Sequence, residues 1–465
     1  MTTPVDLIPL SQQAVRLGAA FAAAGRELHL VGGPVRDALM GRPSADLDFA
    51  TDARPSEVQQ LVAPLGSAVW TTGIAYGTVG VRVDGVPCEI TTYRADRYDR
   101  VGRNPAVAYG DSLADDLLRR DFTMNAMALS VTGDLAFTDP YGGLADLARG
   151  VLRTPGTPAE SFEDDPLRML RAARFVSTLG VRVATEVDAA LRTLAPSLAR
   201  ITAERVQIEL SKLLLGAAPR AGLELLVDTG LADVVLPELP ALQMAADEHG
   251  QHKDVYAHTL QVLDQAVDLE DAGPDLTLRW AALLHDVGKP ETRAFLPGGR
   301  VTFHHHEVVG ARLARKRLKA LRYSNDLIDD VAKLVFLHLR FYGYRSTEWT
   351  DSAVRRYVVD AGPLLPRLNR LVRSDCTTRN KRKAAALASA YDALEQRIAA
   401  LRKQEELDRI RPDLNGEEIM SILSISPGPL VGKAYQHLLA LRMAHGPLGH
   451  DRAVSELQSW YAANS

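Results

Sequence analysis

One stretch near the N-terminus, LVGGPVRDALMGRPSADLDFAT at residues 30–51, constrains the fold of this chain more than any other. The apolar run that ends at Val31 predicts a strand, which the Gly32-Gly33 pair ends, and Pro34 suits the first turn of a following helix. A glycine pair at such a turn lets backbone N–H groups and the helix N-terminus approach a phosphate closely. The stretch therefore predicts a phosphate-binding turn between a strand and a helix, with Gly33 in it.

A second strand, predicted over residues 45–50, contains two carboxylates. Side chains alternate along a strand, so Asp46 and Asp48 share one face while Leu47 and Phe49 point into a core. Two carboxylates on one face can hold two divalent cations about 3.5–4 Å apart, as in phosphoryl and nucleotidyl transfer. A short D-x-D strand alone is also compatible with a solvated sheet edge. The adjoining GGPVRD turn favours the metal site.

A hairpin is predicted over residues 78–92, where two alternating runs flank the turn sequence Asp84-Gly85. In its second strand Cys88 lies on one face and Glu89 on the other. Glu89 is the candidate for a third carboxylate that binds metal or activates an attacking hydroxyl. A solvent-facing strand glutamate is an equally good interpretation of the sequence.

GGPVRD, DLDFAT and the downstream RRDFTMNA at residues 119–126 resemble the motifs of class II tRNA nucleotidyltransferases and bacterial poly(A) polymerases, in the polymerase-β-like superfamily. The resemblance implies an α+β fold: an N-terminal nucleotidyltransferase head, with a mixed sheet and helices, precedes all-α neck, HD and C-terminal domains. It also implies that Arg120 contacts the triphosphate, for which the guanidinium fork is better suited than a lysine. Arg119 is interpreted instead as half of a structural Arg–Asp pair within the helix. The residues expected to hold the nucleotide are Gly33, Arg36, Arg120, Arg171 and Arg174.

The segment 93–110 has no periodicity and contains four arginines, as expected of a functional loop beside an active site. In the resembled family a flexible loop at this place is linked to addition of the final adenosine. Its presence favours an enzyme that adds all of CCA over one that adds only the two cytidines.

The stretch EDDPLRMLRAARF, residues 163–175, predicts how the base is selected. Asp165, Arg168, Arg171 and Arg174 are spaced at intervals of three and are expected on one helical face, with Phe175 among the residues opposite. An Asp acceptor beside an Arg donor complements cytosine and adenine, whereas uracil and guanine present the opposite pattern of donors and acceptors. One such paired contact is worth roughly 1–3 kcal/mol against the wrong base. The alternative is an ordinary surface ion pair, and the family pattern favours base selection.

A second site is predicted between residues 249 and 380, which contain most of the chain's histidines. The spacing resembles that of HD phosphohydrolase domains, in which helices supply His and Asp ligands to one or two divalent metals. The resemblance implies four core ligands and two more for a second metal: His258, His285, Asp286 and Asp375, then His306 and His338. Mixed imidazole and carboxylate ligands suit Mn, Ni, Co, Zn or Fe better than Mg alone. A water activated there would attack a phosphoester.

The composition places these motifs in a multidomain chain without a polycationic coat. The 465 residues have a net charge of −4, so RNA contacts are expected from local basic runs at 312–319 and 379–383. Two cysteines, an N-terminus without signal-peptide features and the lack of a long apolar run indicate a cytoplasmic protein without a membrane span. The expected domains are a head (1–155), a helical neck with base recognition (156–240), an HD domain (241–380) and a helical tail (381–465).

Together these features predict template-independent addition of CCA to tRNA 3′ ends from CTP and ATP. In this reaction Asp46 and Asp48 bind Mg²⁺, and pyrophosphate is released. A bacterial poly(A) polymerase shares every head motif but often has a strongly basic C-terminal extension, which this sequence does not show. A metal-dependent HD phosphohydrolase with an inactive head is a second alternative, against which the intact D-x-D and RRDFTMNA weigh. A non-catalytic RNA-binding protein is a third, weakened by the acidic net charge.

Overall fold

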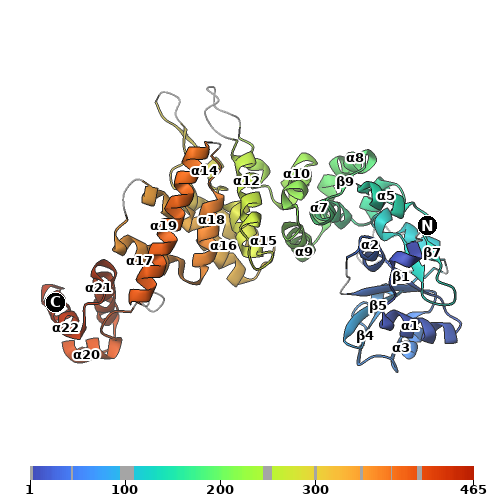
Figure 1. Ribbon diagram of the computed structural model, residues 1–465, viewed down its shortest axis with the longest axis horizontal. Coiled ribbons are helices and arrows are strands. Elements are labelled where there is room, and N and C mark those ends of the chain that lie inside the picture. Colours follow the sequence, from blue (N-terminus) through green and yellow to red (C-terminus); the bar gives the residue numbers. More distant parts are fainter. Residues whose placement is uncertain are drawn as a thin grey trace. The chain divides into compact units, whose positions relative to one another are not determined.

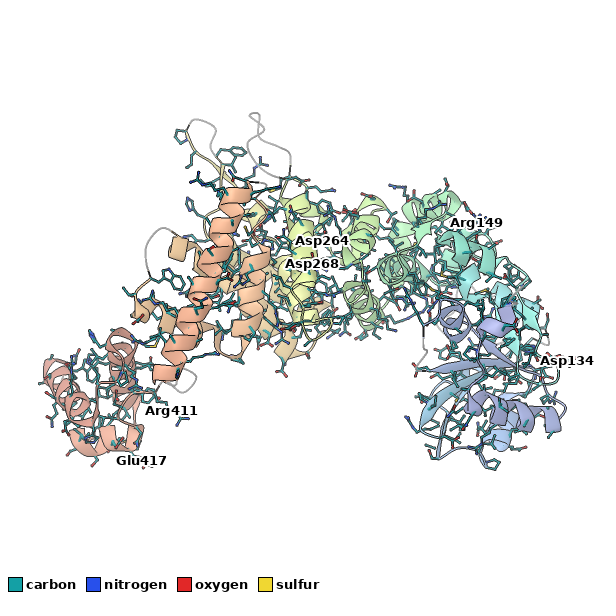
Figure 2. The ribbon with its side chains drawn as sticks, viewed as in Figure 1. Asp134, Arg149, Asp264, Asp268, Arg411 and Glu417 are labelled. Atoms are coloured by element: carbon teal, nitrogen blue, oxygen red, sulfur yellow. The ribbon has the colours of Figure 1, made fainter. Side chains whose placement is uncertain are left out.

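The computed structural model describes residues 4–42, 46–94, 109–110, 112–244, 254–297, 301–345, 349–378, 380–405 and 411–464. The chain forms two compact units, Met1–Pro237 and Glu238–Ser465 (Figure 1). Charged side chains such as those of Asp134, Arg149 and Glu417 are exposed on them (Figure 2).

The first unit contains a seven-stranded mixed sheet, in the order β3-β4-β5-β2-β1-β6-β7. Among the described strands of this sheet, β2 and β5 pair in parallel and the other neighbours are antiparallel. The strands are β1 (Leu28–Val31), β2 (Leu47–Thr51), β3 (Ala68–Trp70), β4 (Thr78–Val83), β5 (Val86–Thr92), β6 (Ala128–Ser130) and β7 (Phe137–Thr138). The mixed sheet predicted for the head is confirmed.

The side chains of β2 point alternately into the hydrophobic core and toward the candidate site. Leu47 and Phe49 are buried in one hydrophobic cluster with Cys88 and Ile90 of β5, while Asp48 points to the other face. β2 begins at Leu47, later than expected, and Asp46 forms a bend just before it. The β4–β5 hairpin has the predicted bounds.

Helices surround the sheet and continue into the neck. Ser11 caps the first of them, as its side chain accepts a hydrogen bond from the Ala14 N–H. The helices of this unit are α1 (Gln12–Ala23), α2 (Gly33–Leu39), α3 (Pro55–Val62), α4 (Leu113–Leu118), α5 (Gly143–Arg149), α6 (Pro158–Asp164), α7 (Leu167–Leu179), α8 (Thr185–Leu194), α9 (Ala203–Leu214), α10 (Pro219–Asp228) and α11 (Leu231–Val235). α7 packs against both α9 and α10 in the neck.

The second unit is helical apart from one short strand pair. Its core includes Trp280, Leu260, Leu334 and Leu368, from four different helices. The helices are α12 (Val255–Asp268), α13 (Leu276–Leu284), α14 (Lys289–Thr292), α15 (His306–Ala320), α16 (Asn325–Leu337), α17 (Asp351–Ala361), α18 (Leu365–Ser374), α19 (Lys381–Glu405), α20 (Gly416–Leu423), α21 (Pro429–His445) and α22 (His450–Asn464).

Three short strands, β9, β10 and β11, lie in the region after residue 155 that was expected to be entirely helical. β10 (Ala294–Phe295) pairs with β11 (Val301–Thr302), and in the first unit β8 (Val151–Leu152) pairs in parallel with β9 (Arg182–Val183). None of the helices in the described part of the chain is long and apolar enough to cross a membrane.

Candidate active site and metal centre

Three carboxylates lie close together near the start of β2, which is an interior strand of the head's sheet. Asp48 of β2 lies directly opposite Glu89 of β5 in the parallel register, so both side chains lie on the same face. Asp46 lies two residues before Asp48 and is exposed. The structure thus brings together the three acidic residues singled out in the sequence.

The carboxylates perturb one another. Burial, together with the negative charges of Glu89 and Asp46, raises the pKa of Asp48 to about 6, against the opposing effect of Arg120. Repulsion among oxygen donors of this kind is relieved by a divalent cation, and an all-carboxylate set suits a hard ion such as Mg²⁺. The residues present therefore fit a cation held by Asp46 and Asp48.

Arg120 lies beside these carboxylates across the glycine turn. Gly32 has a φ of 72°, and a Cβ at this position would lie 3.0 Å from Nη1 of Arg120 and 4.0 Å from Oδ2 of Asp48. A side chain there would be strained by the backbone and would press on the guanidinium. The glycine thus allows a basic and an acidic group to face each other over the turn.

The two arginines of RRDFTMNA hold different parts of the head. Nη2 of Arg120 lies 3.1 Å from Oδ2 of Asp116, one turn earlier on α4. Arg119 ends α4, where its carbonyl accepts a hydrogen bond from Arg168. The Arg–Asp pair expected for the side chain of Arg119 stays a prediction.

A cavity of about 520 Å³ adjoins the carboxylates. Two of the arginines from α7 line it, together with Arg36 from α2 and Lys212 from α9. The lining residues are Gly33, Pro34, Arg36, Asp46, Asp48, Asn125, Arg171, Arg174, Phe175, Thr178, Lys212 and Leu215. Six of the residues expected from the sequence to bind metal or nucleotide line this cavity: Gly33, Arg36, Asp46, Asp48, Arg171 and Arg174.

Phe175 was expected on the face of α7 opposite the arginines, but its ring lies among them. The guanidinium carbons of Arg174, Arg36 and Arg171 lie 4.4, 5.1 and 5.8 Å from its ring centroid. The ring follows Arg174 directly, and a position 100° further around the helix is close enough for a planar side chain to pack under its neighbours.

Two buried carboxylates hold the arginines of α7. Asp121 lies 2.5 Å from Nη2 of Arg171, and Glu209 lies 3.1 Å from Nη1 of Arg174. Burial alone would raise the pKa of Asp121, but Arg171 and a hydrogen bond from Asn125 lower it to about 2. Burial, together with the charge of Arg171, lowers the pKa of Arg174 to about 10.

Asp165 and Arg168 lie near the N-terminal end of α7 and do not line the cavity. Asp165 ends α6, so it shares no helix with Arg168, because Pro166 starts a new one. Its Oδ2 accepts a 2.8 Å hydrogen bond from Arg205 of α9. Arg168 donates to the carbonyl of Arg119 (2.6 Å) and to Oγ of Ser161 (2.8 Å).

The expected functional loop lies mostly outside the described residues. Its two ends meet in a bridge between Arg94 and Tyr109. Arg97, Arg100 and Arg103 are not described.

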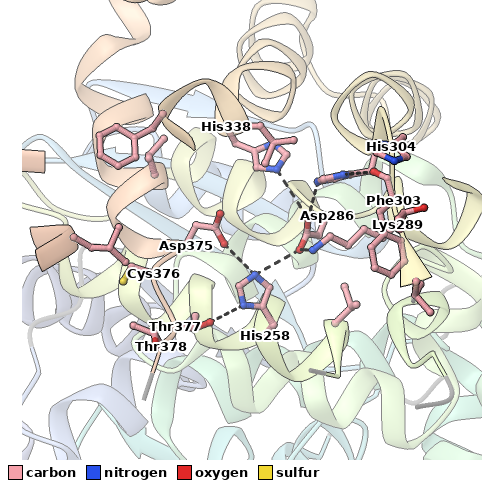
Figure 3. A pocket seen from close by; sticks show the side chains of 18 of the residues that line it. His258, Asp286, Lys289, Phe303, His304, His338, Asp375, Cys376, Thr377 and Thr378 are labelled. Atoms are coloured by element: carbon pink, nitrogen blue, oxygen red, sulfur yellow. Dashed lines mark hydrogen bonds and ion pairs between the residues drawn. The ribbon is translucent and has the colours of Figure 1, made fainter. Parts of the chain in front are cut away.

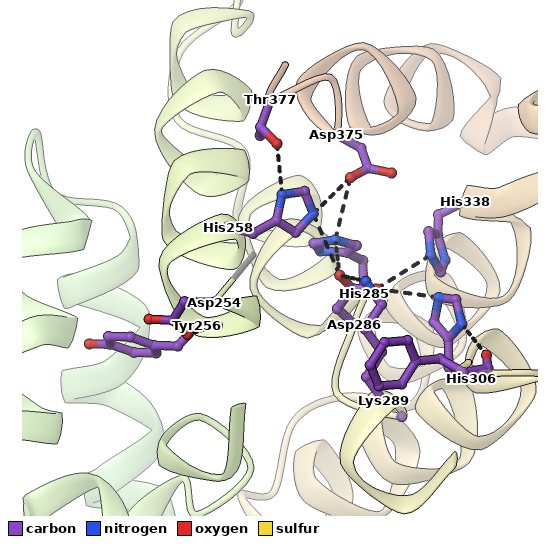
Figure 4. A network of polar contacts seen from close by, with 12 residues as sticks. Asp254, Tyr256, His258, His285, Asp286, Lys289, His306, His338, Asp375 and Thr377 are labelled. Carbon is purple, nitrogen blue, oxygen red and sulfur yellow. Dashed lines mark hydrogen bonds and ion pairs between the residues drawn. The ribbon is translucent and has the colours of Figure 1, made fainter. Parts of the chain in front are cut away.

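The second site assembles six side chains from five parts of the helical unit. Three of these side chains, His258, His285 and Asp375, offer ligand atoms within 4.8 Å of one another, and so do Asp286, His306 and His338. They come from α12, the end of α13, the start of α15, the end of α16 and the end of α18 (Figure 4). The structure therefore brings together all six residues of the predicted HD site.

Backbone hydrogen bonds orient the imidazoles. Nδ1 of His285, His306 and His338 lies 2.6–2.8 Å from the carbonyl three residues earlier in each case. A carbonyl in this position accepts the proton of Nδ1, so in the neutral form of each ring Nε2 carries the free lone pair. Among the described residues, none of these three buried Nε2 atoms has a hydrogen-bond partner. Buried nitrogen lone pairs that point at carboxylates fit a divalent cation.

The charges of the site are tightly linked. Burial would raise the pKa of Asp286, but His285 and Lys289 hold it well below its usual value. Burial, with the charge of His285, lowers the pKa of His338 to about 4. A neutral His338 is available as a metal ligand throughout the physiological range.

A cavity of about 680 Å³ opens onto these ligands (Figure 3). Its wall combines cationic, hydroxyl and aromatic side chains, among them Lys289, Lys383, Thr377, Phe303 and Tyr391. Lys289 lies 2.6 Å from Oδ2 of Asp286, and Thr377 lies 2.9 Å from Nδ1 of His258. Such a wall can accept a phosphate together with an attached flat or apolar group.

Several residues of these sites were missed in the sequence. Asp121 and Asn125 stand at i,i+4 within RRDFTMNA, and Lys289 follows His285-Asp286 at a fixed short spacing, so the motifs themselves contained a signal. Arg205 and Glu209 carried no such signal, since the residues with which they pair lie far away in the sequence.

The basic run at 312–319 was expected to contact RNA. In it, Arg312, Arg315 and Arg317 are paired with Glu291, Asp329 and Glu238.

Known protein families match most of this chain. The model of the poly(A) polymerase head domain matches residues 28–153, that of the probable RNA- and SrmB-binding site of polymerase A matches 180–242, and that of the HD domain matches 255–380. The head and the HD domain thus both belong to families whose members depend on divalent metals.

Curated relatives and solved structures agree with these matches. An A-adding tRNA nucleotidyltransferase of Deinococcus radiodurans is 36% identical over 440 residues, covering 93% of this chain and 95% of the relative. A CCA-adding enzyme of Anoxybacillus flavithermus is 32% identical over 432 residues, covering 92% and 91%. The crystal structure of the Bacillus stearothermophilus CCA-adding enzyme in complex with CTP aligns over 100% of this chain and 99% of that one, with 25% identity and a TM-score of 0.67.

The sheet with its carboxylates, the arginine-lined cavity and the helical neck define a nucleotidyltransferase joined to an HD domain. The chain belongs to the tRNA nucleotidyltransferase/poly(A) polymerase family.

Proposed function

We propose that this enzyme adds the CCA sequence to tRNA 3′ ends from CTP and ATP without a nucleic-acid template, in the cytoplasm. The observation that best supports this function is the cavity in which Asp46 and Asp48, at the start of β2, adjoin the arginines of α2 and α7. Curated relatives that cover more than nine-tenths of the chain add CCA or its last nucleotide to tRNA.

In the proposed reaction Asp46 and Asp48 hold Mg²⁺. Bound there, the ion would polarise the α-phosphate and stabilise charge on the leaving pyrophosphate. Glu89, on the same face as Asp48, is the candidate to accept the proton of the attacking 3′-hydroxyl.

The basic side chains bind the triphosphate. Arg36, Arg171 and Arg174 converge on the ring of Phe175, and Arg120 lies over the glycine turn. Guanidinium groups held in this way pair with phosphate oxygens with little loss of side-chain freedom.

Asp165 and Arg168 select the base. The carboxylate accepts from the exocyclic amine of cytosine or adenine, and the guanidinium donates to the adjacent ring nitrogen. Uracil and guanine leave both groups unpaired, and each lost contact weakens binding of the wrong base by about 1–3 kcal/mol.

One specific observation favours a narrower alternative. The Deinococcus radiodurans relative, which matches nearly the whole chain, is an A-adding enzyme. An enzyme of that kind would extend only tRNA that already ends in CC.

Transcripts of one tRNA that end before CCA, after the first C and after CC distinguish these possibilities. Each is incubated with Mg²⁺ and each nucleotide singly, then with CTP plus ATP, and products are resolved to one nucleotide. CCA addition predicts C on the first two transcripts and A on the third. A-only addition predicts extension of the third alone, and a poly(A) polymerase predicts a long tail on tRNA and on unrelated RNA.

We propose a second activity for the HD domain, metal-dependent hydrolysis of a phosphoester. It is supported by the buried Nε2 atoms that have no hydrogen-bond partner among the described residues and by the adjoining cavity. The ligand set suits Mn, Ni, Co, Zn or Fe. Ring opening of 2′,3′-cyclic nucleotides to nucleoside monophosphates and release of phosphate from 3′-phosphorylated nucleotides would each be measured with every metal in turn. Loss of these activities in Asp286→Asn would support the proposal, and their absence in the wild-type enzyme with all the metals would contradict it.

A further inference from the structure

Four residues lie side by side in one row across the sheet of the head. Trp70 of β3 pairs with Gly80 of β4, Gly80 pairs with Glu89 of β5, and Glu89 pairs with Asp48 of β2. Residues directly opposite each other on neighbouring strands point to the same face of a sheet. The row therefore places the indole of Trp70 on the face that bears the carboxylates of the candidate site.

The indole lies against the bare backbone of Gly80. A Cβ at this glycine would overlap Cε2 and Nε1 of Trp70, so a side chain here would push the ring away. Neighbouring strands are about 4.8 Å apart, which puts this part of the ring about one strand from Glu89 and two from Asp48. The glycine thus lets an aromatic side chain from the edge strand lie close to the reaction centre.

Trp70 is not part of the hydrophobic core beneath the sheet. Val79 and Val81 of β4 point to the other face, and among the described residues the cluster that buries them does not include Trp70. The side chain of Trp70 is only partly buried. Aromatic rings that are accessible in this way commonly stack on the bases of single-stranded RNA.

The nucleotide cavity lies on the other side of the carboxylates along the sheet. Its described lining includes Gly33 and Arg36, which follow β1, but not Trp70. In the strand order, β1 and β3 lie on opposite sides of the β5–β2 pair. The attacking and leaving oxygens of nucleotidyl transfer lie roughly in line through the α-phosphorus. With the triphosphate on the β1 side, the attacking 3′-hydroxyl approaches from the side of Trp70.

We propose that Trp70 stacks on the base of the 3′-terminal nucleotide of the tRNA and thereby places its 3′-hydroxyl beside Glu89. This inference rests on the proposed function. Stacking uses the flat face that every base has, so one tryptophan can hold successive RNA ends that differ in sequence. Each round of nucleotide addition presents such a new end.

Two basic side chains flank Gly80 on the same face. Arg82, two residues after Gly80, is exposed, and Nη2 of Arg94 donates a 3.5 Å hydrogen bond to Oγ1 of Thr78, two residues before it. Guanidinium groups beside an aromatic ring complement the phosphates of an RNA strand. This surface therefore fits a single-stranded RNA end.

The test uses the full-length enzyme and tRNA transcripts whose 3′-terminal nucleotide either has its base or is abasic. CTP addition is measured on transcripts ending before CCA, and ATP addition on transcripts ending in CC. In the wild-type enzyme, removal of the terminal base should lower kcat/KM for the transcript about tenfold, within the range for one base stacked on an aromatic side chain.

Trp70→Ala should lower kcat/KM for the normal transcript by a similar factor and leave KM for CTP and ATP at the wild-type values. In this variant the abasic transcript should react as well as the normal one, because the interaction is already lost. Trp70→Phe, which keeps a ring, should recover part of the loss. The comparison of two transcripts within one variant does not depend on how much active protein that variant yields.

Two controls complete the design. Val69→Ala alters the neighbouring residue of β3, whose side chain points to the other face, and should leave both transcripts at their wild-type values. Removal of the base before the terminal one should affect the wild-type enzyme and Trp70→Ala alike.

An unchanged kcat/KM for the normal transcript in Trp70→Ala would overturn the proposal, and so would an abasic penalty in Trp70→Ala as large as in the wild-type enzyme. A raised KM for CTP and ATP in Trp70→Ala would also overturn it, because the ring would then serve the incoming nucleotide. If the wild-type enzyme extends no transcript, the proposed function itself fails, which is a different result.

Discussion

Asp48 and Glu89 lie directly opposite each other on the parallel strands β2 and β5 of the head's sheet. Their side chains therefore share the face that adjoins the arginine-lined cavity. Burial and the charges of Glu89 and Asp46 together raise the pKa of Asp48 to about 6. The same repulsion that makes the metal-free site unfavourable makes a cation favourable there.

The first prediction concerns the pH dependence of nucleotide addition. Metal binding requires ionised Asp48, so kcat/KM for CTP should fall as the pH drops through about 6. Removing one neighbouring charge in Glu89→Gln lowers the pKa of Asp48 and should move the acidic limb to lower pH. The midpoint, and not the absolute rate, is the observable, because Glu89 also takes part in the proposed reaction. An unmoved midpoint in Glu89→Gln would contradict the coupling.

The second prediction concerns stability without metal. The pKa of Asp48 in the folded protein lies above its ordinary value of about 3.9, so ionised Asp48 destabilises the fold increasingly between about pH 4 and pH 6 and fully above that range. Asp48→Asn should abolish nucleotide addition yet stabilise the metal-free protein by about 1–2 kcal/mol at pH 8. Urea unfolding in EDTA measures this, and the difference should vanish near pH 4. A destabilised Asp48→Asn protein would refute the electrostatic account.

The third prediction concerns the glycine turn. Gly32→Ala adds backbone strain at a φ of 72° and places a Cβ 3.0 Å from Nη1 of Arg120, so KM for both nucleotides should rise. Gly41→Ala is the matched control: its φ is 68°, but no atom lies within 4 Å of the added Cβ. Gly41→Ala should lose about 1 kcal/mol of stability. Gly32→Ala should lose more, because its ψ of −131° lies outside the left-handed helical region, and it alone should change KM. Equal KM values in the two variants would show that contact with Arg120 is unimportant.

The fourth prediction concerns the support of Arg171. Asp121 has a lowered pKa, so it contributes stability above its ordinary value near 3.9, and this contribution is lost as the pH falls towards about 2. Asp121→Asn should cost about 3 kcal/mol at pH 7, because Arg171 keeps its charge but loses its buried partner. KM for nucleotides should rise as well. Glu186→Gln, which breaks an exposed pair with Arg153, should change stability by less than about 1 kcal/mol and leave KM unaltered.

The fifth prediction separates the two sites. His285→Ala should remove bound transition metal, measured by elemental analysis of the purified protein, and leave CCA addition intact. His305→Ala, one residue before the ligand His306 but with an 82% exposed side chain, should keep the metal. Metal retained in His285→Ala would contradict the ligand assignment.

The sequence predicted the features that depend on local pattern. Asp84 and Gly85 adopt φ values of 49° and 83°, as a two-residue hairpin turn requires, and the flanking alternation sets which residues face the core. The six residues expected in the HD site followed from the resemblance to HD domains, and the helices of the second unit bring their side chains together. The mixed sheet and helical remainder followed from the same patterns and the family resemblance.

What the sequence did not predict depends on contacts between distant segments. Arg205 pairs with Asp165 across 40 positions, and Arg171 pairs with Asp121 across 50. The expectation of one continuous helical face through Asp165 and Arg168 failed because Pro166 starts a new helix. Phe175 was placed on the wrong side because helical spacing alone does not reveal where a ring packs among cations.

The most direct test of the central proposal is the intact mass of a tRNA lacking CCA after incubation with the enzyme, Mg²⁺, CTP and ATP. The account predicts one product, heavier by two cytidylates and one adenylate, and no change in mass with Asp48→Asn. An unextended tRNA alongside extension of a CC-ended transcript by one adenylate, or a ladder of adenylates, would contradict it.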